Sequence, residues 1–112
     1  MSAPIDLHGL RCHAAVTAPG GVIDERTEFA FTQRGDVVES RYSGGRVEAG
    51  YLIGRLDGSK LEFRYCQTHT DGEIAGGHSH CKVRLNADGK VEIVEEFEWA
   101  SGGKGTNIIR QL

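Results

Sequence analysis

The sequence predicts an all-β protein, an antiparallel up-and-down meander of about eight strands that closes into a small barrel. Apolar and polar residues alternate with period 2 along most of the chain, as in strands that bury one face. Tight-turn dipeptides such as Gly44-Gly45 and Asp57-Gly58 separate these segments. Closure would remove the two exposed edges of the meander. The alternative is a twisted, half-open sheet that closes by forming a homodimer.

Length and charge narrow the range of functions. The 112 residues suffice for one domain, residues 1–112, with a single core. The net charge of −3 argues against nucleic-acid binding, which needs a basic face. No apolar run approaches the roughly 18 residues of a membrane span. Because the N-terminal residues lack the pattern of a secretory signal, we expect a cytoplasmic protein whose three cysteines are free thiols.

The first half of the chain supplies four predicted strands. After a short lead-in, they cover residues 8–18, 25–34, 37–43 and 46–56, and Pro19-Gly20-Gly21 turns the chain between the first two. One face of each strand collects its apolar residues. In order along the four strands, these faces hold Leu10, Cys12, Ala14 and Val16; Thr27, Phe29 and Phe31; Val38, Ser40 and Tyr42; and Val47, Ala49, Tyr51 and Ile53.

The second half supplies four more strands, over residues 60–69, 73–85, 90–99 and 106–110. The Gly76-Gly77 pair predicts a bend, a bulge or a close backbone approach. Ser101 to Gly105 forms a loop, either a plain turn or a lid over the barrel mouth. The inward faces of the first three of these strands hold Leu61, Phe63, Tyr65 and Gln67; Ala75, Gly77, Ser79, Cys81, Val83 and Leu85; and Val91, Ile93, Glu95, Phe97 and Trp99.

Several short motifs along these strands resemble a known family. They are Tyr42-Ser43-Gly44-Gly45, Gly50-Tyr51-Leu52-Ile53-Gly54, Glu98-Trp99, Ser101-Gly102 and Lys104-Gly105-Thr106. Over residues 8 to 110 the chain resembles short bacterial β-barrel proteins of the avidin or lipocalin type, whose members often carry the label "n-acetylglutamate synthase". The resemblance implies a small barrel, and the label implies acetyl transfer as an alternative activity. The usual acetyl-CoA site needs a glycine-rich loop that leads into a helix, and the sequence shows neither.

The mixed character of the inner face predicts that the barrel binds a small, partly apolar molecule without a cofactor. Small-ligand sites combine apolar and aromatic walls with a few polar groups that orient the ligand. Glu95 is the sharpest signal, since a buried carboxylate must be paired, hydrogen-bonded or protonated. Arg41, Arg46 or Arg64 would be its partner if a bulge shifted the register, and a slip of one residue would instead place Glu96 inside. The predicted ligand-binding residues are Tyr42, Tyr51, Tyr65, Gln67, Glu95, Phe97 and Trp99.

Cysteines and histidines offer a second, weaker candidate site. Cys66, His78 and His80 would share the outer face of two adjacent strands and could hold a metal such as zinc, although their spacing fits no strong zinc pattern. The alternative to a metal site is that these residues are scattered surface histidines and small buried thiols that bind nothing. Neighbouring side chains in a strand point apart, so His80 and Cys81 cannot act as base and nucleophile. We therefore expect a binding protein. The alternatives are an enzyme, by acetyl transfer or by metal-assisted chemistry through these histidines and cysteines, and a structural dimer whose barrel is filled by its own side chains.

Overall fold

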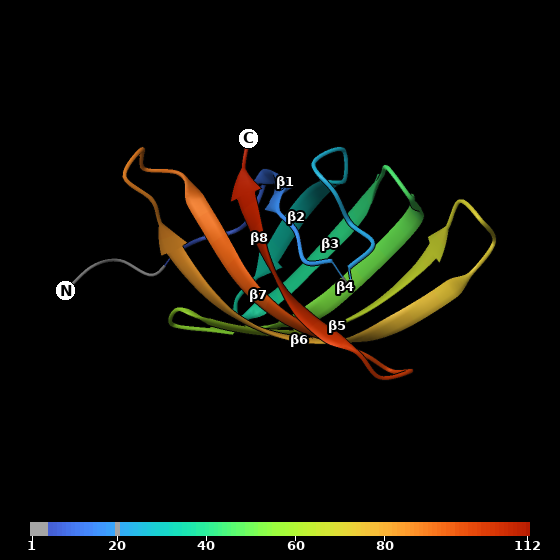
Figure 1. Cartoon of the computed structure of the whole chain (residues 1–112). Coiled ribbons are helices and arrows are strands. Elements are labelled where there is room, and N and C mark those ends of the chain that lie inside the picture. Colours follow the sequence, from blue (N-terminus) through green and yellow to red (C-terminus); the bar gives the residue numbers. More distant parts are fainter. Residues whose placement is uncertain (1–4, 20) are drawn as a thin grey trace.

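The computed structural model describes residues 5–19 and 21–112, and all the regular structure in these residues is β-strand. Each strand pairs antiparallel with the next, and β8 returns to pair with β1, so one chain closes the barrel without a partner (Figure 1). The predicted closed meander is confirmed, and the half-open sheet is wrong. No helix of the described residues could span a membrane. The strands are β1 (Arg11–Val16), β2 (Glu28–Arg34), β3 (Val37–Gly44), β4 (Val47–Asp57), β5 (Lys60–His69), β6 (Ile74–Leu85), β7 (Val91–Trp99) and β8 (Lys104–Gln111).

Alternation predicts the inner faces of β2, β3, β5 and β7 correctly. Phe29 and Phe31 of β2 are buried, as are the predicted inward residues of β5, from Leu61 to Gln67. The β7 register is continuous on both sides, with Glu95 opposite Cys81 on β6 and opposite Asn107 on β8. No slip therefore occurs at Glu95, and the strand that carries the buried carboxylate is held between two neighbours.

The N-terminal segment differs from the prediction of one long first strand. β1 begins only at Arg11, and residues 5–10 precede it, although the backbones of Gly9 and Leu10 still hydrogen-bond to Phe31 of β2. Leu7 is fully buried, and its backbone N–H donates to Gln33 Oε1 at 2.9 Å, next to the β2–β3 turn. This segment closes one end of the barrel with an apolar side chain. Residues 1–4 and Gly20, the middle of the predicted Pro19-Gly20-Gly21 turn, lie outside the described residues.

The predicted inner face of β4 is wrong beyond Val47. Tyr51 and Ile53 lie on the outer face, 39% and 44% exposed, whereas Leu52 and Leu56 are buried. The cause is a register shift between Val47 and Ala49, which turns every later side chain to the other face. The sequence hides the true inner face because two of its positions are glycines.

Glycines on the inner face make room for aromatic side chains. A Cβ at Gly50 would collide with the ring of Tyr42, the residue opposite it on β3. A Cβ at Gly77 would lie 2.6 Å from the hydroxyl oxygen of Tyr65. The β6 register is continuous at Gly77, so the predicted close backbone approach is confirmed and the bulge is not.

Two further residues predicted to face inward, outside β4, are exposed. Val16 follows a register shift between Ala14 and Val16 in the pairing of β1 with β8, and it is 50% exposed. Leu85 is the last residue of β6 and is 59% exposed. Both lie at the ends of their strands. There, apolar residues still alternate with polar ones in the sequence, but the barrel no longer buries them.

Candidate functional site

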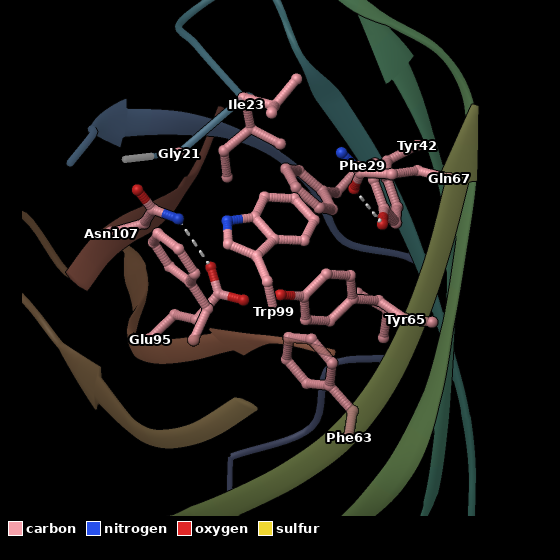
Figure 2. Close-up of a pocket in the computed structure, with 13 residues that line it drawn as sticks. Gly21, Ile23, Phe29, Tyr42, Phe63, Tyr65, Gln67, Glu95, Trp99 and Asn107 are labelled. Carbon is pink, nitrogen blue, oxygen red and sulfur yellow. Dashed lines mark hydrogen bonds between the residues drawn. The ribbon is translucent and has the colours of Figure 1, made fainter. Parts of the chain in front are cut away.

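A cavity lies at the end of the barrel opposite Leu7. Its volume is about 30 Å³, and since roughly 10 to 15 Å³ holds one water molecule by this measure, it has room for about two. Figure 2 shows the lining side chains converging from several strands and from the segment between β1 and β2. The lining residues are Gly21, Val22, Ile23, Phe29, Tyr42, Leu52, Phe63, Tyr65, Gln67, Glu95, Phe97, Trp99 and Asn107.

Trp99 occupies the middle of this group in Figure 2. Its indole meets the ring of Tyr65 edge-on at a centroid separation of 5.4 Å, and the ring of Phe97 at 5.8 Å. These are favourable aromatic geometries. The indole is thus packed against the aromatic walls of the cavity that it lines.

Tyr42 and Gln67 form a buried hydrogen-bonded chain in the wall. The Tyr42 hydroxyl donates to Gln67 Oε1 at 2.8 Å, and Gln67 Nε2 lies 2.8 Å from His69 Nε2. Burial raises the pKa of Tyr42, and a smaller contribution comes from the charge of Glu95. Burial also raises the pKa of Tyr65, whose hydroxyl donates to the carbonyl of Glu98 at 3.3 Å. Both tyrosines therefore stay neutral hydroxyl donors at physiological pH.

Glu95 is the polar centre of the cavity. It is 5% exposed, and its two oxygens accept hydrogen bonds from Ser79 Oγ at 2.7 Å and from Asn107 Nδ2 at 3.0 Å. Burial raises the pKa of the carboxyl group, and the two hydrogen bonds oppose that shift in part. Because both donors are neutral, the carboxyl group keeps its tendency to hold or seek a proton.

The predicted pairing of Glu95 with an arginine is wrong. Arg41 and Arg64 lie on the outer face of the barrel, where both are exposed. The Arg46 side chain lies close enough to Asp24 for its charge to lower the pKa of that carboxyl. Since β7 keeps its register, no shift brings an arginine inside.

Sequence reasoning missed Asn107. Its Nδ2 donates to Glu95, and its Oδ1 accepts from the backbone N–H of Ala18 at 3.0 Å, so its amide orientation is fixed. It also ties the segment after β1 to the cavity. Asn107 shares the buried face of β8 with Ile109, but the apolar Ile108 between them hides this alternation in the sequence. The segment that covers the cavity is Gly21–Ile23 rather than the predicted loop at residues 101–105.

The structure places the predicted site residues on two different faces. Tyr42, Tyr65, Gln67, Glu95, Phe97 and Trp99 line the cavity as expected. Tyr51 does not: it lies outside the barrel, where its hydroxyl donates to Glu39 Oε1 at 2.7 Å. The prediction of Tyr51 as an inward wall residue is therefore wrong, because of the register shift at the start of β4.

The predicted metal candidates lie on the outer face, where the rings of His78 and His80 meet edge-on at a centroid separation of 5.7 Å, but Cys66 does not join them. Cys66 is opposite Gly76 in the β5–β6 register, whereas His78 and His80 are opposite Arg64 and Glu62. Each histidine lies 3.9 Å from a glutamate instead, His78 from Glu98 and His80 from Glu62. In residues 5–19 and 21–112, the ligand atoms of only one group of three residues lie close enough together to hold a metal ion, and that group includes none of these candidates.

The cysteines offer no nucleophile inside the barrel. Cys12 and Cys81 are buried free thiols, and Cys66 is exposed. Burial raises the pKa of Cys12 to about 12, and burial together with the charge of Glu95 raises that of Cys81. A thiol must ionise to attack, so both buried groups are inert at physiological pH.

Comparison with known proteins identifies a family. A family model described as "Avidin-like protein" matches residues 5–112, nearly the whole chain. No curated protein and no solved structure matches.

Proposed function

This chain belongs to the avidin-like protein family, and we propose that it binds one small, partly apolar molecule at the mouth of its barrel. The cavity has the composition of a small-ligand site, with aromatic walls and a few convergent polar groups. Phe97, Tyr65 and Tyr42 supply the walls, and Glu95 and Gln67 supply the polar contacts.

The observation that carries this proposal is the buried Glu95. Its hydrogen-bond donors, Ser79 and Asn107, are neutral, so burial of the carboxyl group costs free energy that an apolar residue would not. A barrel that only filled itself with side chains would have no use for this group. A ligand N–H or O–H that donates to the carboxylate would offset the cost.

The size of the cavity indicates how a ligand would enter. A volume of about 30 Å³ accepts about two water molecules, so anything larger must displace part of the lining. Trp99 and the Gly21–Ile23 segment are the candidates, since the first is only partly buried and the second belongs to a connection outside the sheet. A ligand with a flat apolar body would take over the edge contacts that the indole now makes with Tyr65 and Phe97.

The location and assembly of the protein belong to the same proposal. We place it in the cytoplasm, and the three unpaired cysteines support a reducing compartment. A homodimer is compatible with a barrel that each chain closes alone, since the outer face of β4 exposes Tyr51 and Ile53.

The test begins with the mass of the freshly purified protein under native and then denaturing conditions. A retained molecule appears as a mass difference, and the native mass reports the oligomeric state. Titration of the identified molecule is then followed by the fluorescence of Trp99, the only tryptophan in the chain.

Glu95→Gln should weaken that binding at least tenfold while the variant stays folded. Glu96→Gln is the matched control, since Glu96 is the next residue of β7 and faces outward. A purified protein whose mass equals that of the polypeptide alone would refute the proposal. So would an affinity of Glu95→Gln for the molecule equal to that of Glu96→Gln.

The acetyl-transfer alternative has its own test. A helix N-terminus is the usual cradle for the pyrophosphate of acetyl-CoA, and the described residues contain no helix. We therefore expect acetyl-CoA to give no binding heat in calorimetry. Stoichiometric binding of acetyl-CoA would move the assignment toward an enzyme.

A further inference from the structure

The turn between β5 and β6 carries three metal-ligating residues at alternate positions, in the sequence His69-Thr70-Asp71-Gly72-Glu73. The backbone of the turn is fixed, because the N–H of His69 donates to the carbonyl of Glu73 at 2.8 Å. One imidazole nitrogen and one carboxylate oxygen from each acidic residue lie within 4.8 Å of one another. The turn thus gathers a nitrogen and two oxygens without help from any other element.

His69 is the unusual member of this group. Its side chain is 4% exposed, whereas Glu73 is 64% exposed. The buried Nδ1 atom has no hydrogen-bond partner among the described residues, and it lies 3.9 Å from Glu73 Oε2, too far for a hydrogen bond. A buried nitrogen without a partner is rare, and here it is directed at a carboxylate that reaches back from solvent.

We propose that His69 Nδ1, Asp71 and Glu73 bind a divalent transition-metal ion of the zinc class, with solvent completing the coordination. Zinc accepts imidazole nitrogen and carboxylate oxygen in tetrahedral sets and often keeps one position for water. The nitrogen ligand disfavours calcium and magnesium, which take oxygen ligands. Asp71 Oδ1 accepts from the Glu73 backbone N–H at 3.0 Å, so its second oxygen remains to bind the ion.

The neighbours of His69 can adjust to this role. In the structure, the Gln67 amide directs its nitrogen at His69 Nε2, so that Nε2 accepts and the imidazole proton lies on Nδ1. A metal on Nδ1 displaces that proton, and the neutral ring then carries its proton on Nε2. Rotation of the Gln67 amide by half a turn presents Oε1 to that N–H. Metal-ligating histidines commonly donate their second N–H to a carbonyl or carboxylate in this way.

Calorimetric titration of zinc into protein freed of metal by a chelator tests the site. We expect one zinc per chain for the native sequence. Asp71→Asn and Glu73→Gln should each weaken zinc binding at least tenfold. Both residues are exposed, and an asparagine keeps the Oδ1 acceptor of the turn, so neither variant should affect folding.

His80→Gln is the matched control, because His80 also lies 3.9 Å from a glutamate but is exposed and has no third ligand. It should bind zinc as the native protein does. Quenching of Trp99 fluorescence by cobalt gives a second readout, since the rings of His69 and Trp99 are 6.3 Å apart. The absence of binding heat in the native protein, zinc binding as tight as the native protein's in Asp71→Asn or Glu73→Gln, or loss of binding in His80→Gln would overturn the proposal.

Discussion

Replacement of Glu95 by glutamine separates the cost of its charge from the value of its hydrogen bonds. The two side chains have the same shape, and the surroundings fix how the glutamine must sit. Asn107 cannot reverse its amide without losing the bond from the Ala18 N–H, so its Nδ2 continues to require an acceptor. The glutamine oxygen meets that requirement, and its amide nitrogen then donates to Ser79 Oγ, whose hydroxyl can turn to accept. Glu95→Gln therefore keeps both hydrogen bonds.

The expected magnitude follows from the direction of the pKa shift. Folding raises the pKa of Glu95 above its ordinary value of 4.5. The contribution of the group to stability is therefore fully present below pH 4.5 and is lost as the pH rises through the folded pKa. Each unit of pKa difference costs about 1.4 kcal/mol in the free energy of unfolding. At pH 7 we expect Glu95→Gln to have a larger free energy of unfolding than the native protein, by about 1.4 kcal/mol for each unit by which folding raises the pKa. At pH 4 we expect the two proteins to differ by less than about 1 kcal/mol.

Urea unfolding between pH 4 and pH 8 measures this difference. The native protein should lose stability relative to Glu95→Gln as the pH rises, whereas Glu96→Gln, changed at an exposed position of the same strand, should follow the native protein throughout. A loss of about 2 kcal/mol or more in Glu95→Gln at pH 7 would contradict the reasoning, since it exceeds the usual net value of a neutral hydrogen bond. The carboxylate would then hold the fold rather than serve a ligand.

Three further predictions concern packing, the β4 register and the thiols. Gly50→Ala should cost about 1 to 3 kcal/mol in urea unfolding and weaken ligand binding, because the added methyl group collides with the ring of Tyr42; an unchanged stability would mean that the ring can move aside. Tyr51→Phe, on the outer face, should change stability by less than about 0.5 kcal/mol and leave ligand binding unaltered, and a loss of binding would return Tyr51 to the site. A thiol reagent at pH 8 should modify Cys66 alone in the native protein and all three cysteines in denaturant, because burial raises the pKa of Cys12 to about 12 and also protects the third thiol; fast reaction of a second native thiol would contradict this.

The strand order could be predicted because this chain is a meander of hairpins. Turn dipeptides such as Asp57-Gly58 mark most of the reversals locally, and neighbours in sequence become neighbours in the sheet. The facing of β4 could not be predicted, since the register shift near Val47 leaves no mark in the alternation of residues. The glycines at positions 50 and 54 of the inner face carry no apolar side chain that the alternation would reveal. Tyr42 and Phe63 occupy the space that a side chain would take there.

The site could be predicted in part for a similar reason. Glu95 and Trp99 lie on a strand with an unbroken register, so period 2 alone places them inside. The partners of Glu95 depend on which side chains face it from β6 and β8. Asn107 lies directly opposite Glu95 on β8, whereas Ser79 lies opposite Phe97 on β6. Both nevertheless donate to the Glu95 carboxyl group. The role of Gly21–Ile23 as a cover depends on a long connection, whose path alternation does not describe.

Gln67 belongs to both proposed sites, and its amide links them. In the structure the Tyr42 hydroxyl donates to Gln67 Oε1 and has no hydrogen left for the cavity. Metal binding at His69 Nδ1 turns the amide, so that Gln67 Nε2 faces Tyr42 and the hydroxyl oxygen becomes the acceptor. The Tyr42 hydrogen is then free to meet an acceptor on a ligand. By linkage, zinc should tighten the binding of such a ligand by the same factor as the ligand tightens the binding of zinc. Equal affinities with and without zinc would mean that the amide keeps one orientation and that the two sites act independently.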